Sequence, residues 1–335
     1  MKFALLLLAL VACPKSEQKK PVEPSNPSGA NENPRDGGRQ LLPAAEAGIA
    51  TLPPAPALPE VPLGLPPAPA GVLEAVTPEQ VAFGELLFRD PRLAKFPRIQ
   101  CASCHDIANR YNGVPVPAIG SSELQSDRRD RRTPPQRTPP QLENLAWNPR
   151  AIAAFPEHFT KEMGHDLASA ANAISEVPAY RAHLERIGGP RDEAVTKALV
   201  GFVLTRYDAS SPWDHQERNA ATSKDPVANG YRLFIGKARC GTCHTPPLYT
   251  DGRVHDTGLP TPTATRSLRG VATRAALFSD GRARTLDAAL DYYTKDHPKT
   301  ELVKLTLSAQ ERSDLLAFLG ALTGVVPTAI LQPLP

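Results

Sequence analysis

Two stretches of the 335-residue chain, CASCHD at 101–106 and CGTCHT at 240–245, each place two thiols and an imidazole within five positions. A haem c macrocycle has two vinyl groups that accept thiols as thioethers, and a histidine directly after the second cysteine can ligate the iron. The repeated motif therefore predicts two covalently bound haem c groups. The residues expected to hold them are Cys101, Cys104 and His105 for the first haem and Cys240, Cys243 and His244 for the second.

Two other uses of these residues stay open at this point. Four cysteines and two histidines are also compatible with a zinc site, but a tetrahedral site needs only four ligands and does not explain a histidine directly after each second cysteine. A thioredoxin-like dithiol would need a strand–helix–strand context that the motifs lack. Apart from Cys13, every cysteine of the chain lies in the two motifs, so neither motif has a disulfide partner in its own neighbourhood.

The N-terminus has the pattern of an export signal. One lysine precedes an apolar run from Phe3 to Ala12, which is too short to cross a bilayer as a stable span. We therefore expect a signal peptide at residues 1–12. The run ends in LVAC, which resembles a bacterial lipobox, so Cys13 is the expected lipidation site, with an ordinary signal peptide as the alternative. This predicts a membrane-tethered lipoprotein in the periplasm or cell envelope.

Residues 13–72 are rich in Pro, Ala, Ser, Asn and Gly. Such a segment cannot bury enough apolar surface to offset the entropy lost on ordering, so we expect a disordered tether. The rest of the chain is long enough for two modest domains, which we place at 73–208 and 209–326, followed by a tail at 327–335. The formal net charge of +3 indicates no nucleic-acid role, and no nucleic-acid-reading signature is present.

The folded part is predicted to be mostly α-helical with long loops. Capping-box patterns at 77–80 and 308–311 predict two helix starts. The stretch DEAVTKALVGFVLTRY at 192–207 carries its apolar residues on one helical stripe, and TLDAALDYY at 285–293 predicts a further short helix. No long alternation of β-branched and polar residues indicates strands.

From about Thr77 to Gly324 the chain resembles the di-haem cytochrome c peroxidase and MauG superfamily. Several short strings carry the resemblance, and their shared order makes it specific. The strings are FGELLFRDPRLAKFPRIQCASCHD (83–106), RTPPQLEN (137–144), SSPWD (210–214), GYRLFIGKARCGTCHTPPLYTDGRVHDTGLP (230–260) and RSLRGVATRAALFSDGRARTLDAALDYY (266–293).

The resemblance implies a peroxidase-type oxidoreductase with two cytochrome c-like helical domains, one haem in each, and often a Ca²⁺ ion between them. The N-terminal haem is expected to meet hydrogen peroxide, and the C-terminal haem to relay electrons. The implied partner is a small donor protein, either a cytochrome c or a cupredoxin, or a protein substrate that is oxidised. A non-catalytic di-haem electron-transfer cytochrome is the alternative.

The first haem is expected to have an open distal face. Resting peroxidases of the family have an Ile-Gly-His string whose His caps this iron, and here Ser121 follows Ile and Gly. A serine is a poor ligand for haem iron, although His158 or His165 is an alternative cap. Glu162, in the Glu-Met pair that the family uses for proton transfer, is the expected catalytic residue.

The second haem resembles the MauG branch. The position of the family's axial Met is occupied by Tyr293, and a phenolate stabilises oxidised iron better than a thioether does. Alternatives are that Tyr293 or the adjacent Tyr292 only packs in the core. His255 is a competing sixth ligand, or a residue that orients one by hydrogen bonding.

Some family features are altered. The Phe-Trp-Asp-Gly-Arg string that many members carry before the catalytic Glu is missing, so the coupling between the haems is not implied. Thr138 replaces the family's Asn ligand for calcium, which leaves the Ca²⁺ ion an open expectation. The arginine-rich loop at 126–137 is a docking surface for an acidic donor protein or a solvated loop with arginines near the haem propionates. Arg137 and Arg269 are further candidate site residues.

Overall fold

The computed structural model describes residues 55, 57–96, 99–107, 112–113, 116–117, 136–137 and 139–326. Several predicted features fall outside this part of the chain: the signal peptide, Cys13, most of the tether, Ser121, Thr138, nearly all of the arginine-rich loop and the tail at 327–335. Within the described part, no helix combines the length and the apolar character that crossing a bilayer requires.

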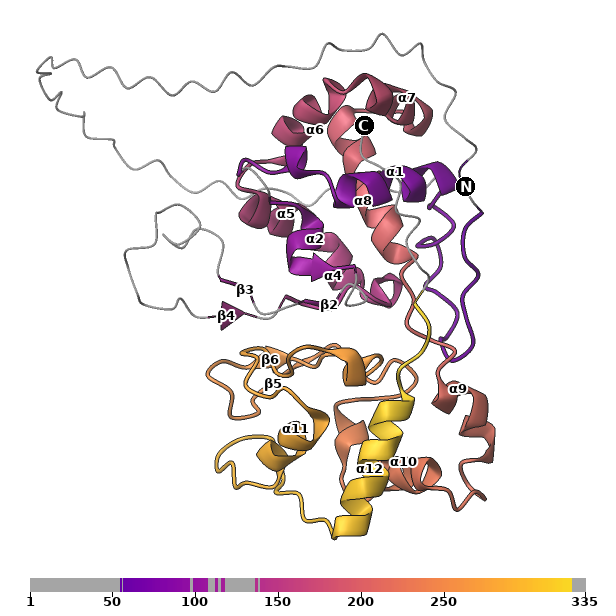
Figure 1. Cartoon of the computed structure of the whole chain (residues 1–335), viewed down its shortest axis with the longest axis vertical. Coiled ribbons are helices and arrows are strands. Elements are labelled where there is room, and N and C mark those ends of the chain that lie inside the picture. Colours follow the sequence, from indigo (N-terminus) through magenta and orange to yellow (C-terminus); the bar gives the residue numbers. More distant parts are fainter. Residues whose placement is uncertain are drawn as a thin grey trace, which may run out of the picture. The chain divides into compact units, whose positions relative to one another are not determined.

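The described chain is mostly helical, which confirms the predicted fold class (Figure 1). The helices are α1 (Pro78–Phe88), α2 (Cys101–Cys104), α4 (Pro149–Ala153), α5 (Phe155–Met163), α6 (Leu167–Ser175), α7 (Pro178–Ile187), α8 (Arg191–Leu204), α9 (Pro212–Gln216), α10 (Pro226–Ile235), α11 (Leu286–Tyr293) and α12 (Ala309–Ala321). The strands form antiparallel pairs: β1 (His105–Asp106) with β2 (Asn112–Gly113), β3 (Val116–Pro117) with β4 (Gln136–Arg137), and β5 (Val254–His255) with β6 (Thr263–Ala264).

The two predicted capping boxes are present. The backbone N–H of Gln80 donates to Thr77 Oγ1 at 3.2 Å, and Thr77 N–H donates back to Gln80 Oε1 at 2.9 Å. Ser308 and Glu311 make the same reciprocal pair at the start of α12. Because each box satisfies two N–H groups that the helix itself leaves unpaired, it fixes where α1 and α12 begin.

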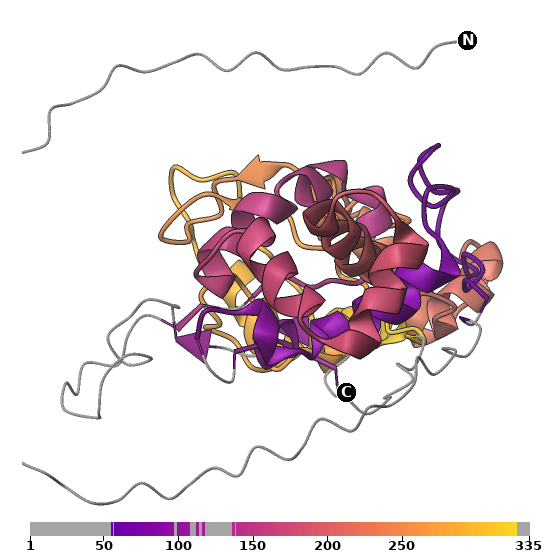
Figure 2. The same ribbon diagram turned by 90° about the horizontal axis from the view of Figure 1, so that it is seen from above.

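The two halves of the described chain repeat one helix crossing. In the first half α1 packs on α8, and in the second α10 packs on α12, as can be followed in Figure 1 and Figure 2. Each crossing depends on a glycine: a Cβ on Gly84 would lie 2.0 Å from the carbonyl oxygen of Ala198, and a Cβ on Gly230 would lie 2.0 Å from that of Asp314. Only glycine therefore allows the two backbones to approach so closely.

Apolar side chains form a separate core around each crossing. The first includes Phe83 and Leu199, and a neighbouring cluster adds Phe88 and Phe202. The second is centred on aromatic rings: Trp213, Phe234, Tyr249 and Phe318 are buried and in contact with one another. The two cores provide similar platforms beside the two CxxCH motifs.

The last part of the predicted tether lies against the folded chain. The indole N–H of Trp147 donates to the carbonyl oxygens of Pro66 and Pro67 at 3.1 and 3.2 Å. The Arg269 guanidinium donates to the carbonyl oxygen of Gly64, and Val72 packs against the cluster around Phe202. Proline carbonyls remain good acceptors although proline lacks an N–H, which explains how a proline-rich segment is held here.

Candidate active site

The first CxxCH motif forms a single helical turn. Cys101 and Cys104 begin and end α2, three residues apart, so their side chains emerge on the same side of the turn. His105 follows as the first residue of β1, paired with Gly113, and is only 6% exposed. Burial raises the pKa of the Cys101 thiol to about 12. The turn thus presents two thiols and one buried imidazole together.

Helix α5 contributes to the same site. Its side chains Phe159 and Met163 belong to the buried cluster against which Cys101 packs, and Glu162 is 6% exposed. His158 lies one helical turn before Glu162, and its ring centroid is 6.3 Å from that of His105. The structure therefore brings the predicted catalytic Glu162 and the predicted ligand His105 to one region of the fold.

The C-terminal end of α5 is held firmly. The N–H of Lys95 donates to the carbonyl oxygen of Met163 at 2.8 Å. Gly164 ends the helix with φ of 78°, a left-handed conformation that favours glycine, and an added Cβ would lie 2.6 Å from the ring of Phe96. Glu162 is thus placed by a helix end that is anchored on the segment leading into the first motif.

The second motif holds its histidine in one orientation. Cys240–Thr242 form a short 3-10 turn, and the backbone N–H of His244 donates to the carbonyl oxygen of Cys240 at 2.9 Å. The ring Nδ1 of His244 lies 3.1 Å from the carbonyl oxygen of Tyr249, so this nitrogen must carry the proton and donate it. Burial lowers the pKa of His244 to about 4, which keeps the ring neutral. A neutral imidazole that donates through Nδ1 is suited to ligate a metal through Nε2.

Tyr293 lies beside the second motif. It packs against the same core as Cys240, and burial raises its pKa, with smaller contributions from the Cys240 and Cys243 thiols. The adjacent Tyr292 points elsewhere, because its hydroxyl donates to the carbonyl oxygen of Thr257 at 2.8 Å. The geometry therefore distinguishes the two tyrosines and brings Tyr293 near the thiols.

These surroundings fit a haem. The surrounding protein excludes most of the water near Cys240, His244 and Tyr293. Each of these side chains nevertheless keeps part of its surface accessible and is half-buried. That combination is expected of side chains on the wall of a concave site. The four cysteines of the motifs are free thiols, so none is used in a disulfide. Among the described residues no group of three or more His, Cys, Asp and Glu side chains has the arrangement of a metal site.

Comparison with known proteins decides the family. The model of the di-haem cytochrome c peroxidase family matches residues 78–222. The methylamine utilization protein MauG of Methylorubrum extorquens is 30% identical over 298 residues, which cover 77% of this chain and 82% of that protein. The chain belongs to the di-haem cytochrome c peroxidase and MauG family. It is therefore an oxidoreductase of a family that uses haem cofactors.

Other relatives and solved structures agree with this membership. The cytochrome c551 peroxidase of Nitrosomonas europaea is 28% identical, with 80% of this chain and 87% of that protein covered. A MauG-like protein associated with microbial copper homeostasis has a similar fold, with a TM-score of 0.62 at 22% identity over 79% of this chain and 95% of that one. The di-haem peroxidase BthA of Burkholderia thailandensis gives a TM-score of 0.53 at 18% identity, over 76% and 89% of the two chains.

Each ring nitrogen of His255 lies within hydrogen-bond distance of a carboxylate. Nδ1 lies 2.6 Å from a carboxylate oxygen of Glu301, and Nε2 lies 2.9 Å from one of Asp251. The charge of Asp251 acts on both Cys243 and His244, so this His255 clamp stands next to the second motif. The arrangement favours the alternative in which His255 orients its neighbours over the one in which it ligates iron.

The Arg269 side chain is buried and forms an ion pair and backbone hydrogen bonds within the protein. Its guanidinium makes two hydrogen bonds of 2.9 Å to the carboxylate of Asp214, and Nε donates to the carbonyl oxygen of Pro247 at 2.8 Å. Both side chains of the ion pair are 1% exposed. Arg269 therefore ties α9 to the loop after the second motif.

Two other candidate residues lie in the first half. Arg137 is described only through its backbone, which pairs with Val116. His165 Nε2 lies 2.6 Å from the carbonyl oxygen of Leu93.

Sequence reasoning did not find the partners that hold these groups. His158 and Glu162 are four residues apart, a spacing that places them on one helix face and could have identified them as a pair. Glu301 is 46 residues from His255 and has no sequence signal linking the two. The Tyr249 carbonyl is a backbone group, and any residue type would supply it.

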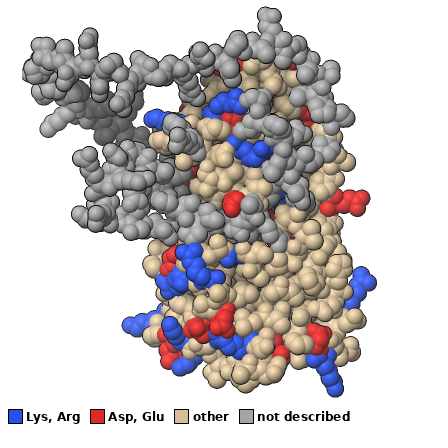
Figure 3. Space-filling model, in the orientation of Figure 1, with Lys and Arg blue, Asp and Glu red and all other residues tan. Residues whose placement is uncertain are grey.

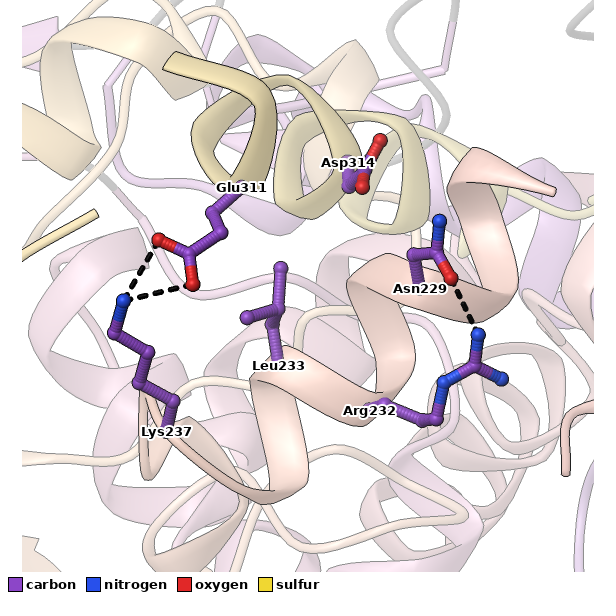
Figure 4. Close-up of a pocket in the computed structure, with 6 residues that line it drawn as sticks. All are labelled: Asn229, Arg232, Leu233, Lys237, Glu311 and Asp314. Atoms are coloured by element: carbon purple, nitrogen blue, oxygen red, sulfur yellow. Dashed lines mark hydrogen bonds and ion pairs between the residues drawn. The ribbon is translucent and has the colours of Figure 1, made fainter. Parts of the chain in front are cut away.

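A surface hollow between α10 and α12 is a weaker candidate (Figure 4). Across it, Lys237 Nζ lies 2.7 Å from both carboxylate oxygens of Glu311, and Arg232 donates to Asn229. Asp314 accepts from Gln310 at 2.8 Å. Figure 3 likewise shows Lys and Arg interspersed with Asp and Glu over the part of this face that carries α11 and α12. These charges neutralise one another and do not indicate a ligand site.

Proposed function

We propose that the protein reduces hydrogen peroxide at the first haem site, with electrons that reach it through the second. The observation that carries this proposal is the position of Glu162, a buried carboxyl group on α5 that follows by one helical turn His158, whose ring centroid lies 6.3 Å from that of His105. Bound haem supplies an iron that takes up peroxide and exchanges single electrons. His105 would hold that iron from one side, and Cys101 and Cys104 would fix the ring covalently.

Glu162 would move the proton that the reaction requires. Reduction of one peroxide molecule to two water molecules consumes two electrons and two protons. The oxygen–oxygen bond breaks more easily when a side chain takes the proton from one oxygen and delivers it to the departing one. A carboxyl group can do both, and the anchored end of α5 keeps it in place.

The second site would store and pass on electrons. His244 and Tyr293 are its proposed axial ligands, and Cys240 and Cys243 its attachment points. A phenolate stabilises the oxidised iron, so this site is suited to holding an oxidising equivalent. The electrons would come from a small cytochrome c or cupredoxin, or from a protein substrate that becomes oxidised.

The surrounding organisation is proposed from the sequence. We propose two cytochrome c-like domains at 73–208 and 209–326, a division that the repeated helix crossing supports. Export through the signal at 1–12 and lipidation of Cys13 would place the protein in the periplasm or cell envelope, tethered to a membrane. A Ca²⁺ ion between the domains stays a prediction.

The test is the substitution Glu162→Gln, which keeps the shape of the side chain and removes the carboxylate. We expect two haems per chain by the pyridine haemochrome assay, as in wild type, and peroxide consumption slower by about 10²–10⁴-fold. Glu157→Gln is the matched control, because Glu157 is an exposed residue of the same helix. Unchanged turnover in Glu162→Gln would remove Glu162 from this role. Wild-type protein that binds two haems but ignores peroxide would instead support the electron-transfer alternative.

A further inference from the structure

The loop that follows the second motif is held along its backbone by a single segment of the chain. Three successive carbonyl oxygens, at 247–249, accept hydrogen bonds from residues 267–269. The donors are Arg269 Nε to Pro247 at 2.8 Å, Ser267 Oγ to Leu248 at 2.6 Å, and the Leu268 N–H to Tyr249 at 3.2 Å. The Tyr249 carbonyl also accepts from His244 Nδ1 at 3.1 Å. The acceptor that orients the proposed iron ligand is therefore placed by residues 267–269.

Tyr249 needs this support because its backbone is strained. Its φ is 55°, in the left-handed region that residues other than glycine rarely occupy. Such a conformation persists only where the surrounding contacts determine it. The side chain is fully buried, and the carbonyl oxygen has two donors. Loss of the support would let the Tyr249 backbone relax and turn its carbonyl away from His244.

Arg269 is itself held by the last part of the predicted tether, residues 57–72, which we call the tether end. The guanidinium donates to the carbonyl oxygen of Gly64 and makes two hydrogen bonds of 2.9 Å to the Asp214 carboxylate. That carboxylate also accepts from the N–H and Oγ of Ser211 at 2.8 and 2.9 Å, which fixes its orientation. Gly64 lies so close to it that an added Cβ would collide with the carboxylate, and the φ of 93° also favours glycine.

The tether end is fastened on both sides of Gly64. Before it, the Ser210 N–H donates to the carbonyl oxygen of Leu63 at 2.8 Å. After it, the Trp147 indole donates to the carbonyl oxygens of residues 66–67 at 3.1 and 3.2 Å. Because these contacts already order the segment, the Gly64 carbonyl is presented to its donor at little further entropic cost.

We propose that the tether end is a positioning element of the second site. It acts through Arg269 on the Tyr249 carbonyl, and through that carbonyl on His244. The inference rests on the proposed function, in which His244 ligates the second iron. It gives Gly64 a role that composition does not indicate, since the residue lies in a segment whose sequence is typical of a linker.

The consequence concerns the reduction potential of the second haem. A hydrogen bond from Nδ1 makes a histidine ring a stronger donor to a metal at Nε2. Stronger donation favours the oxidised state of a bound iron. Loosening the tether end would weaken the bond from His244 to the Tyr249 carbonyl, and the potential of the second haem would rise.

The experiment is a spectroelectrochemical titration of Gly64→Ala in the full-length protein carrying both haems, and it needs no peroxide. We expect the ratio of reduced to oxidised second haem at a fixed potential to rise about tenfold, which is about 59 mV for one electron. The first haem should be unchanged. Cys243→Ala leaves one vinyl group of the second haem unreacted and shifts its absorption band, which assigns the two potentials.

Gly71→Ala is the matched control. Gly71 lies in the same tether end with a similar φ of 82°, but an added Cβ would meet nothing within 4 Å. The substitution therefore imposes comparable backbone strain without touching the ion pair, and both potentials should match wild type.

The outcomes separate this inference from the proposed function. An unchanged second potential in Gly64→Ala would overturn the positioning role even if Glu162→Gln abolishes peroxide turnover. A raised potential with normal turnover in Glu162→Gln would keep the positioning role and reject the proposed role of Glu162. Equal shifts in Gly64→Ala and Gly71→Ala would reject the route through Arg269.

A second variant decides the question if Gly64→Ala does not fold with two haems. Trp147→Phe removes the indole N–H that holds residues 66–67 and leaves Arg269 and Asp214 as they are. We expect a rise of the second potential that is smaller than tenfold in the same ratio, and no rise would overturn the inference.

Discussion

The two CxxCH sites share a motif and a helix crossing, yet different side chains face them. Near His105 stand an exposed histidine and a buried carboxyl group, both from α5. Near His244 stands the phenol of Tyr293, from α11, and the imidazole itself is fixed by the Tyr249 carbonyl. In the proposed function the first set would transfer protons, and the second would stabilise a positive iron.

This difference shows which parts of the chain decide the chemistry. The motif would fix where a haem is attached, and a crossing at Gly84 or Gly230 provides the platform. The proposed reactive groups come later: Glu162 lies 57 residues after His105 (162 minus 105), and Tyr293 lies 49 after His244 (293 minus 244). Each site thus acquires its character from one helix that belongs to neither the motif nor the crossing.

The largest effect is expected from Tyr293→Phe, which removes the phenol and keeps the ring. Axial ligands alone move haem potentials over a range of about 0.8 V, so losing a phenolate should raise the reduction potential of the second haem by roughly 0.2 V. A spectroelectrochemical titration measures both haems at once. The first haem, which Tyr293 does not approach, should keep its potential.

Tyr292→Phe is the matched control for this change. It removes the hydroxyl that donates to Thr257 and leaves Tyr293 in place. We expect both potentials to stay within a few hundredths of a volt of wild type, because an altered hydrogen bond outside the ligand sphere acts weakly on the iron. A large shift in Tyr292→Phe and none in Tyr293→Phe would exchange the assignments of the two tyrosines.

The helix starts and the mostly helical class could be predicted from the sequence, because they depend on residues that are close together in the chain. The capping boxes at Thr77 and Ser308 involve residues three apart, so the pattern and the structure coincide. The mostly helical class followed from apolar periodicity in the same way. Family resemblance added Glu162 and Tyr293, which no local pattern marks as functional.

The remainder depends on contacts between distant residues. The contact of His255 with Glu301 and the bond from Arg269 to Gly64 join positions that are far apart in the sequence. The predicted tether at 13–72 has a composition typical of a disordered segment, yet carbonyl groups near its end are acceptors for Trp147 and Arg269. Composition does not reveal such acceptors because every residue type has a backbone carbonyl.

The second prediction compares the buried acids of the two halves. Asp214→Ala leaves the Arg269 guanidinium buried without its counter-charge, which should lower the free energy of unfolding by about 3–5 kcal/mol. In the first half Asp90 is equally buried and also accepts from the buried Tyr180 hydroxyl at 2.7 Å, but its charged partner Arg92 is 36% exposed and can turn to water. Asp90→Ala should therefore cost less, about 1–3 kcal/mol. Denaturant unfolding of the haem-loaded variants measures both, and equal losses would show that exposure of the partner does not matter here.

The smallest effect concerns pH at the second site, which the His255 clamp adjoins. Hydrogen bonds to Glu301 and Asp251 raise the pKa of His255 above its ordinary value of 6.5, so its contribution is complete below pH 6.5 and is lost as the pH rises through the raised value. Asp251 has its pKa lowered to about 2, with hydrogen bonds from Arg253 and His255 outweighing burial, so its contribution is complete above pH 4 and is lost as the pH falls towards 2.

The pKa of Glu301 is likewise lowered from its ordinary 4.5 by the hydrogen bond from His255, so the clamp should stabilise the second site most between about pH 4.5 and 6.5. We expect His255→Gln to lower Tm by roughly 1–2 °C in that window, and the difference from wild type to shrink above it. Thermal unfolding followed at each haem band separates the two sites. This difference should be absent at the first haem band, since all three clamp residues belong to the second half of the chain. A Tm difference that is constant from pH 5 to pH 9 would mean that His255 acts through its shape and not through its charge.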